Sequence, residues 1–204
     1  MVQIEDSMTA RLSPDETDAP LELVVLLADD GSRIGTTQKS TVHDFDTALH
    51  LAFSCHVLND RGEVLVTRRA LGKRAWPGVW SNAFCGHPLP DEPMAAAITR
   101  RAAFELGLTL RDITVMLPDF RYRATDSSGI VENEICPVYV ATAIGSPVPN
   151  ADEVAEYAWT SPLALQRAAA DAPWAFSPWL ILQLAQLDTT ERGLGMSISG
   201  EPRA

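Results

Sequence analysis

NAFCGHPLPDEPMAAAITRRAAFELGL, residues 82–108, is the stretch around which we interpret the rest of the chain. It begins with a thiol and an imidazole two positions apart, Cys85 and His87, and continues through a proline-rich loop. From about residue 93 to residue 106 the spacing of apolar and charged residues predicts a helix, and Gly107 suits the left-handed end of that helix. A loop with Cys and His that leads into a helix with Arg and Glu indicates an active site.

The spacing within this stretch resembles the signature of the Nudix superfamily, whose hydrolases process diphosphates. The positions that agree with the signature are Gly86, Glu92, Arg100, Glu105, Gly107 and Leu108. Two positions depart from it, because Arg101 and Phe104 stand where the signature has Glu. In Nudix hydrolases the clustered carboxylates hold metal ions, and a hard divalent cation needs several oxygen ligands. The resemblance therefore implies a Nudix scaffold that has lost its hydrolytic metal site.

Length and net charge limit the classes of protein to which this chain can belong. A chain of 204 residues with 46% hydrophobic residues suits one globular domain with a substantial core. The formal net charge of −11 argues against a nucleic-acid or anionic-membrane surface. No apolar run approaches the roughly 18 residues that a membrane span needs. We therefore expect neither nucleic acid nor a membrane as a partner.

Cysteine use and terminal composition predict the location and the domain boundaries. Cys55, Cys85 and Cys136 are odd in number and widely spaced, and no secretory leader is expected. This pattern predicts a reduced, cytoplasmic protein. Residues 1–20 are expected to form a flexible acidic tail and residues 188–204 a second loose tail. The single folded domain is expected at residues 21–187.

Short apolar runs between turn residues predict a mixed α+β domain. Strands are expected at residues 21–27, 33–37, 49–58, 63–68, 119–125, 130–140 and 157–159. Helices are expected at residues 93–106, 162–170 and 178–187. Residues 39–43 are expected in a polar connection and residues 152–156 in an acidic loop. This order favours a mixed sheet flanked by helices.

Several polar residues have an ordinary explanation when each is taken alone. His43 suits a surface loop, and His50 suits an ordinary strand. Glu132 and Glu134 lie two positions apart on a predicted strand, so both point to one face, where either a cation or solvent could separate their charges. The basic run at residues 68–74 suits either an anion site or a solvated loop.

Three longer segments are similar to the type I isopentenyl-diphosphate Δ-isomerase family. They are HLAFSCHVLNDRGEVLVTRRALGKRAWPGVWSNAFCGHP at 50–88, PDFRYRATDSSGIVENEICPVY at 118–139 and PWAFSPW at 173–179. The resemblance runs from about residue 21 to residue 187 and implies a Nudix-like fold. It implies the interconversion of isopentenyl and dimethylallyl diphosphate through a tertiary carbocation, which feeds isoprenoid biosynthesis. The alternative is a diphosphate hydrolase, against which Arg101 and Phe104 argue.

The resemblance also implies a set of metal ligands. An octahedral site for Mn²⁺ or Mg²⁺ is expected from His43, His50, His87, Glu132 and Glu134, with Cys85 close to the metal. Three imidazoles and two carboxylates suit these ions. Glu105 is expected to help hold a second Mg²⁺ on the diphosphate of the substrate.

The remaining roles that the resemblance implies concern the substrate. Cys85 and Glu134 are expected to exchange protons with opposite faces of the substrate, with Tyr122 hydrogen-bonded near Glu134. The residues expected to contact or surround the diphosphate are Lys39, Arg69, Lys73 and Arg101. Trp179 is expected to stack over the carbocation, whereas Trp76 and Trp174 are expected to serve in packing. Both a monomer and a homodimer remain compatible with the sequence.

Overall fold

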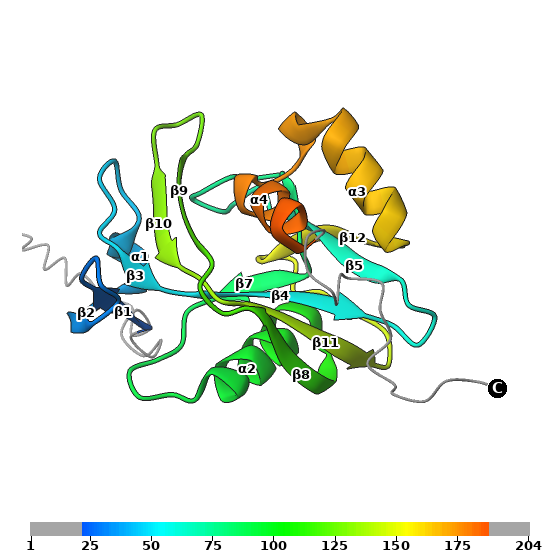
Figure 1. Cartoon of the computed structure of the whole chain (residues 1–204), viewed down its shortest axis with the longest axis horizontal. Helices are drawn as coiled ribbons and strands as arrows, with labels where there is room; N and C mark the ends of the chain where they lie inside the picture. The colour runs from blue at the N-terminus through cyan, green and yellow to red at the C-terminus, as the bar shows by residue number, and fades with distance from the viewer. Residues whose placement is uncertain (1–21, 188–204) are drawn as a thin grey trace, which may run out of the picture.

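The computed structural model describes residues 22–187, so both predicted tails lie outside the described residues. The β strands form two mixed sheets (Figure 1). The five-stranded sheet has the order β2 (Arg33–Gln38), β1 (Leu23–Leu27), β3 (His50–Leu51), β10 (Val131–Ile135), β9 (Arg121–Thr125). The larger sheet has the order β12 (Val154–Thr160), β5 (Val64–Arg69), β4 (Phe53–Leu58), β11 (Val138–Ile144), β8 (Thr109–Leu117), with β6 (Trp80–Ser81) on β5 and β7 (Phe84–Gly86) on β4.

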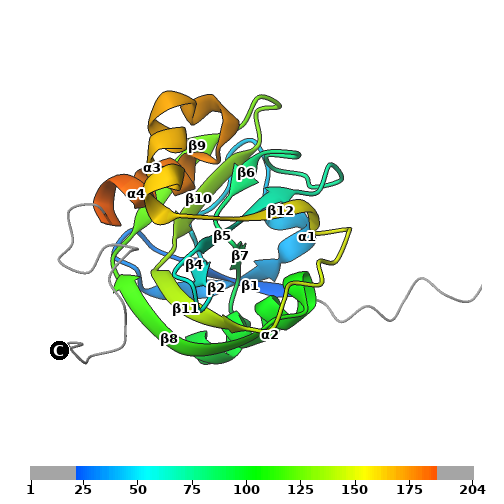
Figure 2. The same cartoon turned by 90° about the vertical axis from the view of Figure 1, so that its right-hand side faces the viewer.

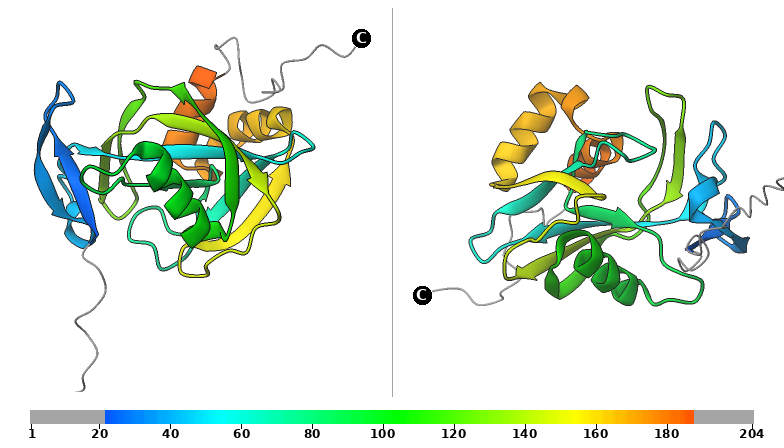
Figure 3. Two further views of the ribbon diagram at one scale, coloured as in Figure 1. Left: turned by 90° about the horizontal axis from the view of Figure 1, so that it is seen from below. Right: turned by 180° about the vertical axis from the view of Figure 1, so that it is seen from behind.

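Helices cover both faces of the larger sheet, as Figure 1 and Figure 2 show from two directions. Helix α2 (Met94–Leu106) lies across one face and is seen in front of the strands in the view from below (Figure 3). On the other face lie α3 (Pro162–Asp171) and α4 (Pro178–Leu187), joined by the short 3-10 turn η1 (Pro173–Ala175). The prediction of an α+β domain with a mixed sheet flanked by helices is confirmed.

Side chains on both faces of the larger sheet are buried, because each face has its own helix layer. On β5, Val64 and Val66 join the core beneath α4, whereas Leu65 joins the core beneath α2. Ile98 on α2 and Leu180 on α4 are fully buried on their respective sides. Each such aliphatic side chain stabilises the fold by about 1.5–3 kcal/mol.

Two predicted strands are each broken into two, and the two breaks lie side by side. Residues 49–58 divide at Ala52 into β3 and β4, and residues 130–140 divide at Pro137 into β10 and β11, so each half joins a different sheet. Pro137 has no N–H to donate to a strand partner, which favours an interruption there. Hydrogen bonds from Ala52 N to Ile135 O (3.0 Å) and from Ser54 N to Pro137 O (3.1 Å) keep the two segments parallel through the break.

Other boundaries also correct the sequence prediction. Strand β8 was not predicted, and residues 39–42, expected in a polar connection, form the one-turn helix α1 (Lys39–Val42). The expected acidic loop at 152–156 is wrong from Val154 onward. Those residues begin β12, where Glu156 pairs with Arg68 across the strands at 2.7 Å. Opposite charges on paired strands stabilise this register. No helix in the described part of the chain is long and apolar enough to cross a membrane.

Two predicted helix ends are confirmed. Ser161 precedes α3, and its Oγ accepts a hydrogen bond from Ala164 N at 3.2 Å, which caps the first turn. Gly107 ends α2 with φ of 60°, the left-handed conformation that glycine adopts most readily. Gly86 is needed for a different reason. An added Cβ would lie 2.9 Å from both Arg101 Cγ and Phe53 Cζ, so only glycine lets β7 approach α2 this closely.

Candidate active site

A cavity of about 570 Å³ opens between α1, β7, α2 and the loop after β5. Its volume lies within the range usual for small-molecule sites. Every residue that the sequence predicted for the site lines this cavity except His50, which is fully buried. The cavity therefore brings together side chains from nearly the whole described chain.

One end of the cavity holds a cluster of imidazoles and carboxylates. The ring centroids of His43, His50 and His87 lie 5.1 to 5.7 Å from one another. Candidate ligand atoms of these three residues and of Glu134 all lie within 4.8 Å of each other. Glu132 joins them through its Oε2, which lies 2.9 Å from His43 Nε2. The five predicted ligands are thus neighbours in the structure.

The strand pairing explains how these residues meet. His43 follows the last turn of α1, and His87 follows β7. His50 on β3 is the register partner of Glu134 on β10, so the two side chains lie next to each other on one face. Oε1 of Glu134 lies 3.4 Å from His50 Nε2 and 3.2 Å from His87 Nε2.

The donor atoms in this cluster suit a bound divalent cation. His43 Nε2, His50 Nε2 and Glu132 Oε2 are buried and have no hydrogen-bond partner among the described residues. His50 Nδ1 donates to Ala48 O at 2.9 Å, which leaves its Nε2 lone pair directed at the cluster. Buried polar atoms rarely stay unpaired, so a cation that accepts these lone pairs fits the residues present.

The two carboxylates of the cluster, Glu132 and Glu134, repel each other when both are ionised. Burial opposes the ionisation of Glu134, but the adjacent imidazoles of His50 and His87 outweigh it and hold its pKa well below the usual range. Burial and the neighbouring charge of Glu134 raise the pKa of Glu132. Burial lowers the pKa of His87 to about 4, so that imidazole is neutral and able to ligate. A divalent cation between the two carboxylates would remove the conflict.

Cys85 lies on β7 at the cavity wall. Burial raises the pKa of its thiol to about 12, so at neutral pH the group carries its proton. Its Sγ lies 3.2 Å from Ser54 Oγ and 3.5 Å from Asn82 Oδ1. Tyr122 is the register partner of Glu134 on the adjacent strand, so both side chains face the cavity. A hydrogen bond between Tyr122 and Glu134 stays a prediction.

Aromatic side chains enclose the cavity on the side of α4. Trp179 is buried and lies 5.4 Å from Trp76 and 5.7 Å from Tyr122, measured between ring centroids. The guanidinium of Arg69 lies 5.4 Å from the centre of the Trp179 ring. Trp76 packs in the core as predicted. The packing role predicted for Trp174 is wrong, because η1 turns that side chain outward and leaves it 84% exposed.

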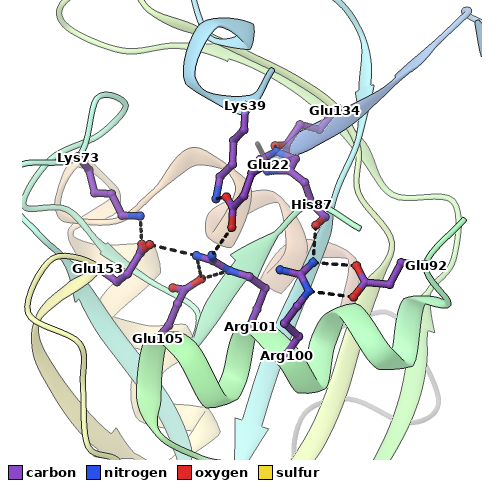
Figure 4. A network of polar contacts seen from close by, with 10 residues as sticks. All are labelled: Glu22, Lys39, Lys73, His87, Glu92, Arg100, Arg101, Glu105, Glu134 and Glu153. Atoms are coloured by element: carbon purple, nitrogen blue, oxygen red, sulfur yellow. Dashed lines mark hydrogen bonds and ion pairs between the residues drawn. The ribbon is translucent and has the colours of Figure 1, made fainter. Parts of the chain in front are cut away.

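The opposite end of the cavity is lined by cations that already have carboxylate partners (Figure 4). Lys39 Nζ lies 2.5 Å from Glu22, and Lys73 pairs with Glu153. Arg101 is bound by three carboxylates at once: Glu105 at 2.6 Å, Glu153 at 3.2 Å and Glu22 at 3.7 Å. Arg69 instead donates to the carbonyl of Ala75 at 2.9 Å. The four predicted diphosphate-binding cations therefore share one wall.

Glu22 and Glu153 are site residues that the sequence did not predict. Glu22 precedes the first strand, and Glu153 lies in a short acidic segment where a solvated carboxylate is the simpler interpretation. Neither position matches a motif, so only the tertiary structure reveals that both line the cavity. Their pairing with Lys39, Lys73 and Arg101 keeps an otherwise strongly basic wall close to neutral.

The retained Nudix residues Glu92 and Arg100 hold the loop that carries His87. Arg100 binds both oxygens of Glu92 at 2.8 and 2.7 Å and also donates to the backbone carbonyl of His87 at 3.2 Å (Figure 4). Glu92 in turn accepts from Leu89 N at 2.8 Å. A two-oxygen pairing of this kind fixes geometry as well as charge, so the pair positions the imidazole of His87.

Comparison with known proteins gives consistent results. The model of the NUDIX domain family matches residues 48–180. The chain is 62% identical over 180 residues to an isopentenyl-diphosphate Δ-isomerase from Agromyces mediolanus, covering 88% of this chain and 87% of that protein. It is 63% identical over 166 residues to an isopentenyl-diphosphate Δ-isomerase from Clavibacter sepedonicus, covering 81% and 87% of the two chains. A solved structure from Deinococcus radiodurans superposes with a TM-score of 0.61 at 19% identity, covering 81% and 98%, and shows a shared fold.

Proposed function

Because the chain belongs to the type I isopentenyl-diphosphate Δ-isomerase family of the Nudix superfamily, we propose that its cavity binds isopentenyl diphosphate with the diphosphate on the cationic wall and the alkene beside Cys85. The enzyme interconverts isopentenyl diphosphate and dimethylallyl diphosphate and serves isoprenoid synthesis. The observation that supports this orientation is that Cys85, residues of the imidazole–carboxylate cluster and four cations all line one cavity.

The reaction consists of two proton transfers that leave the composition of the substrate unchanged. A proton adds to the terminal alkene carbon, the π electrons form the new C–H bond, and a tertiary carbocation results. A proton then leaves the methylene on the diphosphate side, and its electron pair forms the new double bond. We assign these transfers to Cys85 and Glu134 on opposite sides of the substrate, with Tyr122 beside Glu134.

The imidazole–carboxylate cluster is the proposed site of Mg²⁺ or Mn²⁺, held by His43, His50, His87, Glu132 and Glu134, with Cys85 close by. When bound, such an ion supplies positive charge that neutralises the carboxylate pair. Glu105 is the proposed contact for a second Mg²⁺ that accompanies the diphosphate. On the chain's side, His87 stays neutral through burial, and Glu134 stays ionised and able to accept a proton.

The aromatic wall is the proposed shield of the carbocation. The indole face of Trp179 offers the negative part of its ring quadrupole to a cation. Its Nε1 donates to Ser81 Oγ at 2.9 Å and to Asn82 Oδ1 at 3.0 Å, so the ring has a fixed orientation. Trp76 and Tyr122 pack against it and keep water from the intermediate.

The proposed substrate partners are four cations. Lys39, Arg69, Lys73 and Arg101 line the wall where the diphosphate would lie. At the two positions where Nudix hydrolases carry Glu, Arg101 supplies a cation and Phe104 supplies a ring 4.9 Å beneath its guanidinium. This exchange removes two metal-binding carboxylates and adds one phosphate-binding group, which disfavours hydrolysis.

A cytoplasmic location is also part of the proposal. Cys55, Cys85 and Cys136 are all free thiols in the structure. Thiols persist in the reducing cytosol, whereas secreted proteins tend to form disulfides.

The assay that tests the function follows both products. Purified protein with Mg²⁺ and Mn²⁺ is incubated with isopentenyl diphosphate, and dimethylallyl diphosphate and released phosphate are measured together. Formation of the isomer without phosphate is expected, and phosphate without the isomer would identify a hydrolase. Cys85→Ala should lower kcat by about a thousandfold, whereas Cys55→Ala, which removes a buried thiol outside the cavity, should leave kcat close to that of the wild type.

A further inference from the structure

A line of buried polar side chains lies directly behind the Cys85 thiol. His56 Nε2 lies 3.0 Å from Gln183 Oε1, Gln183 Nε2 donates to Ser54 Oγ at 2.8 Å, and Ser54 Oγ lies 3.2 Å from Cys85 Sγ. His56, Gln183 and Ser54 are each 0% exposed, and none of them lines the cavity. Contact with the substrate therefore does not account for them.

These polar residues occupy positions where an apolar core would be expected. Ser54 and His56 lie two apart on β4 and so point to the same face, toward α4. That face otherwise meets apolar side chains such as Leu180 and Leu184. Burying a polar group is unfavourable unless it is hydrogen-bonded. Three linked polar groups in this layer therefore indicate a role that packing alone does not require.

The direction of the hydrogen bonds follows from His56. Its Nδ1 is buried and has no hydrogen-bond partner within the described chain. Burial also lowers the pKa of His56 to about 4, so the ring is neutral and carries one proton. Placing that proton on Nδ1 would bury an N–H without an acceptor, which native structures rarely allow. The proton therefore belongs on Nε2, which donates to Gln183.

The remaining donors follow in sequence. With its oxygen occupied by His56, the amide of Gln183 donates through Nε2 to Ser54 Oγ. Cys136 Sγ, at 3.4 Å, is the other neighbour of the Ser54 hydroxyl. The single S–H of Cys85 donates to Asn82 Oδ1, so in the contact between Ser54 and Cys85 the hydroxyl of Ser54 is the donor.

Asn82 holds the thiol from a second direction. Its Nδ2 donates to the carbonyls of Cys55 and Phe84 at 3.1 and 2.8 Å, which fixes Oδ1 as an acceptor. The S–H of Cys85 donates to that Oδ1 at 3.5 Å. The sulfur thus accepts a hydrogen bond from Ser54 and donates one to Asn82, and both rotation of the thiol and the direction of its proton are restricted.

We propose that His56, Gln183 and Ser54 are positioning residues, and that their line of hydrogen-bond donors holds the Cys85 sulfur where it exchanges a proton with the substrate. The inference rests on the catalytic role proposed above for Cys85. It extends that role to three residues that touch neither the diphosphate nor the alkene. A displacement of about 1 Å in a reacting group can lower a rate about a hundredfold, so a fixed sulfur position has a kinetic consequence.

The kinetic test compares the removal of two buried hydroxyl groups. Ser54→Ala removes the hydroxyl beside the thiol and should lower kcat between about tenfold and a hundredfold, with the KM for isopentenyl diphosphate within about twofold of the wild type. Thr142→Val is the control, because the Thr142 side chain on β11 is also buried but does not line the cavity. Equal kcat values for the two variants would overturn the proposal.

A double-variant cycle tests whether the residues act as one line. Gln183→Met keeps the length of the side chain but breaks the connection between His56 and Ser54, so it should lower kcat less than Ser54→Ala does. The double variant should be no slower than Ser54→Ala alone, because both changes interrupt the same path. A fold loss of kcat in the double variant equal to the product of the two single losses would contradict a shared path.

A measurement independent of turnover separates this proposal from the proposed function. Nitrogen-15 NMR of the histidine rings in the wild type should show His56 neutral at pH 7 with its proton on Nε2, and Gln183→Met should shift that signal. A proton on Nδ1 would reverse the direction of the line and refute the proposal. Wild-type protein that fails to isomerise isopentenyl diphosphate would instead refute the function, while the tautomer of His56 would still report on the line.

Discussion

At one end of the cavity, buried atoms of His43, His50 and Glu132 face one another without hydrogen-bond partners, whereas at the other end Lys39, Lys73 and Arg101 each already pair with a carboxylate. A metal ion at the first end would satisfy atoms that lack partners. A diphosphate at the second end, where we propose that it binds, would exchange one anionic partner for another. The pair of Lys39 with Glu22 is partly exposed, and ion pairs near solvent contribute little net free energy, so exchange at Lys39 favours reversible binding of substrate and product.

Substituting one carboxylate at each end of the cavity tests the comparison most strongly. Glu134→Gln should lower kcat by about a thousandfold, because Glu134 is both a proposed proton-transfer group and a neighbour of two imidazoles. Glu22→Gln should instead lower the KM by about twofold to fivefold, since it frees Lys39 from a surface pair worth about 0.2–1 kcal/mol. Steady-state kinetics of both variants measure the contrast. Equal losses of kcat would show that the two ends do not differ in this way.

Metal removal should affect stability as well as turnover. Adding Mn²⁺ to EDTA-treated protein at about 100 times its Kd should raise the free energy of unfolding by about 2.7 kcal/mol, because the ion binds only the folded cluster. His43→Ala should abolish this increase, whereas Glu63→Gln, a half-buried pair partner of Arg61 outside the cavity, should retain it. Urea unfolding with and without Mn²⁺ measures the difference. An unchanged increase in His43→Ala would place the ion elsewhere.

The cationic end should show a pH dependence that arises from Lys73. Burial lowers the pKa of Lys73 to about 8, so its ammonium loses its proton as the pH rises through that value. Since only the charged form attracts a diphosphate, the KM should rise about tenfold between pH 7 and pH 9. Lys73→Arg keeps the charge throughout this range and should show a nearly constant KM. A rise of the same size in Lys73→Arg would assign the pH dependence to another group.

The smallest expected effect concerns the ring beneath Arg101. Phe104→Ala removes a stacking partner 4.9 Å from the guanidinium and should raise the KM about twofold to fivefold, in keeping with an exposed cation–π contact. Val115→Ala, which changes an exposed apolar residue on strand β8, should leave the KM unchanged. An unaffected KM in Phe104→Ala would show that Glu105 and Glu153 alone suffice to orient Arg101.

The sequence predicts the class of fold well, because the signals for its elements are local. The helix at 93–106, its Gly107 end and the alternation of Glu132 and Glu134 follow from periodicity and turn chemistry. The family resemblance then supplied the distant partners His43 and His50, which have no distinctive pattern of their own. The structure brings these residues to one cavity, and their individual roles remain proposals.

What the sequence could not predict depends on tertiary contacts. The strand-like patterns of residues 49–58 and 130–140 hid the changes of sheet at Ala52 and Pro137, because a run of strand formers does not show which neighbour each half will find. Glu153 was interpreted as part of an acidic loop because a solvated carboxylate needs no partner. Its pairing with Lys73 and Arg101 depends on how β12 meets α2.

The changes of sheet at Ala52 and Pro137 also affect the order in which parts of the enzyme fold. His50 and Glu134 are far apart along the chain, and they become neighbours only through the parallel pairing of β3 with β10. Closing so long a loop is slow and entropically unfavourable, so such contacts tend to form late in folding. The nascent protein therefore completes its proposed cation site only late in folding, when the surrounding sheets have formed.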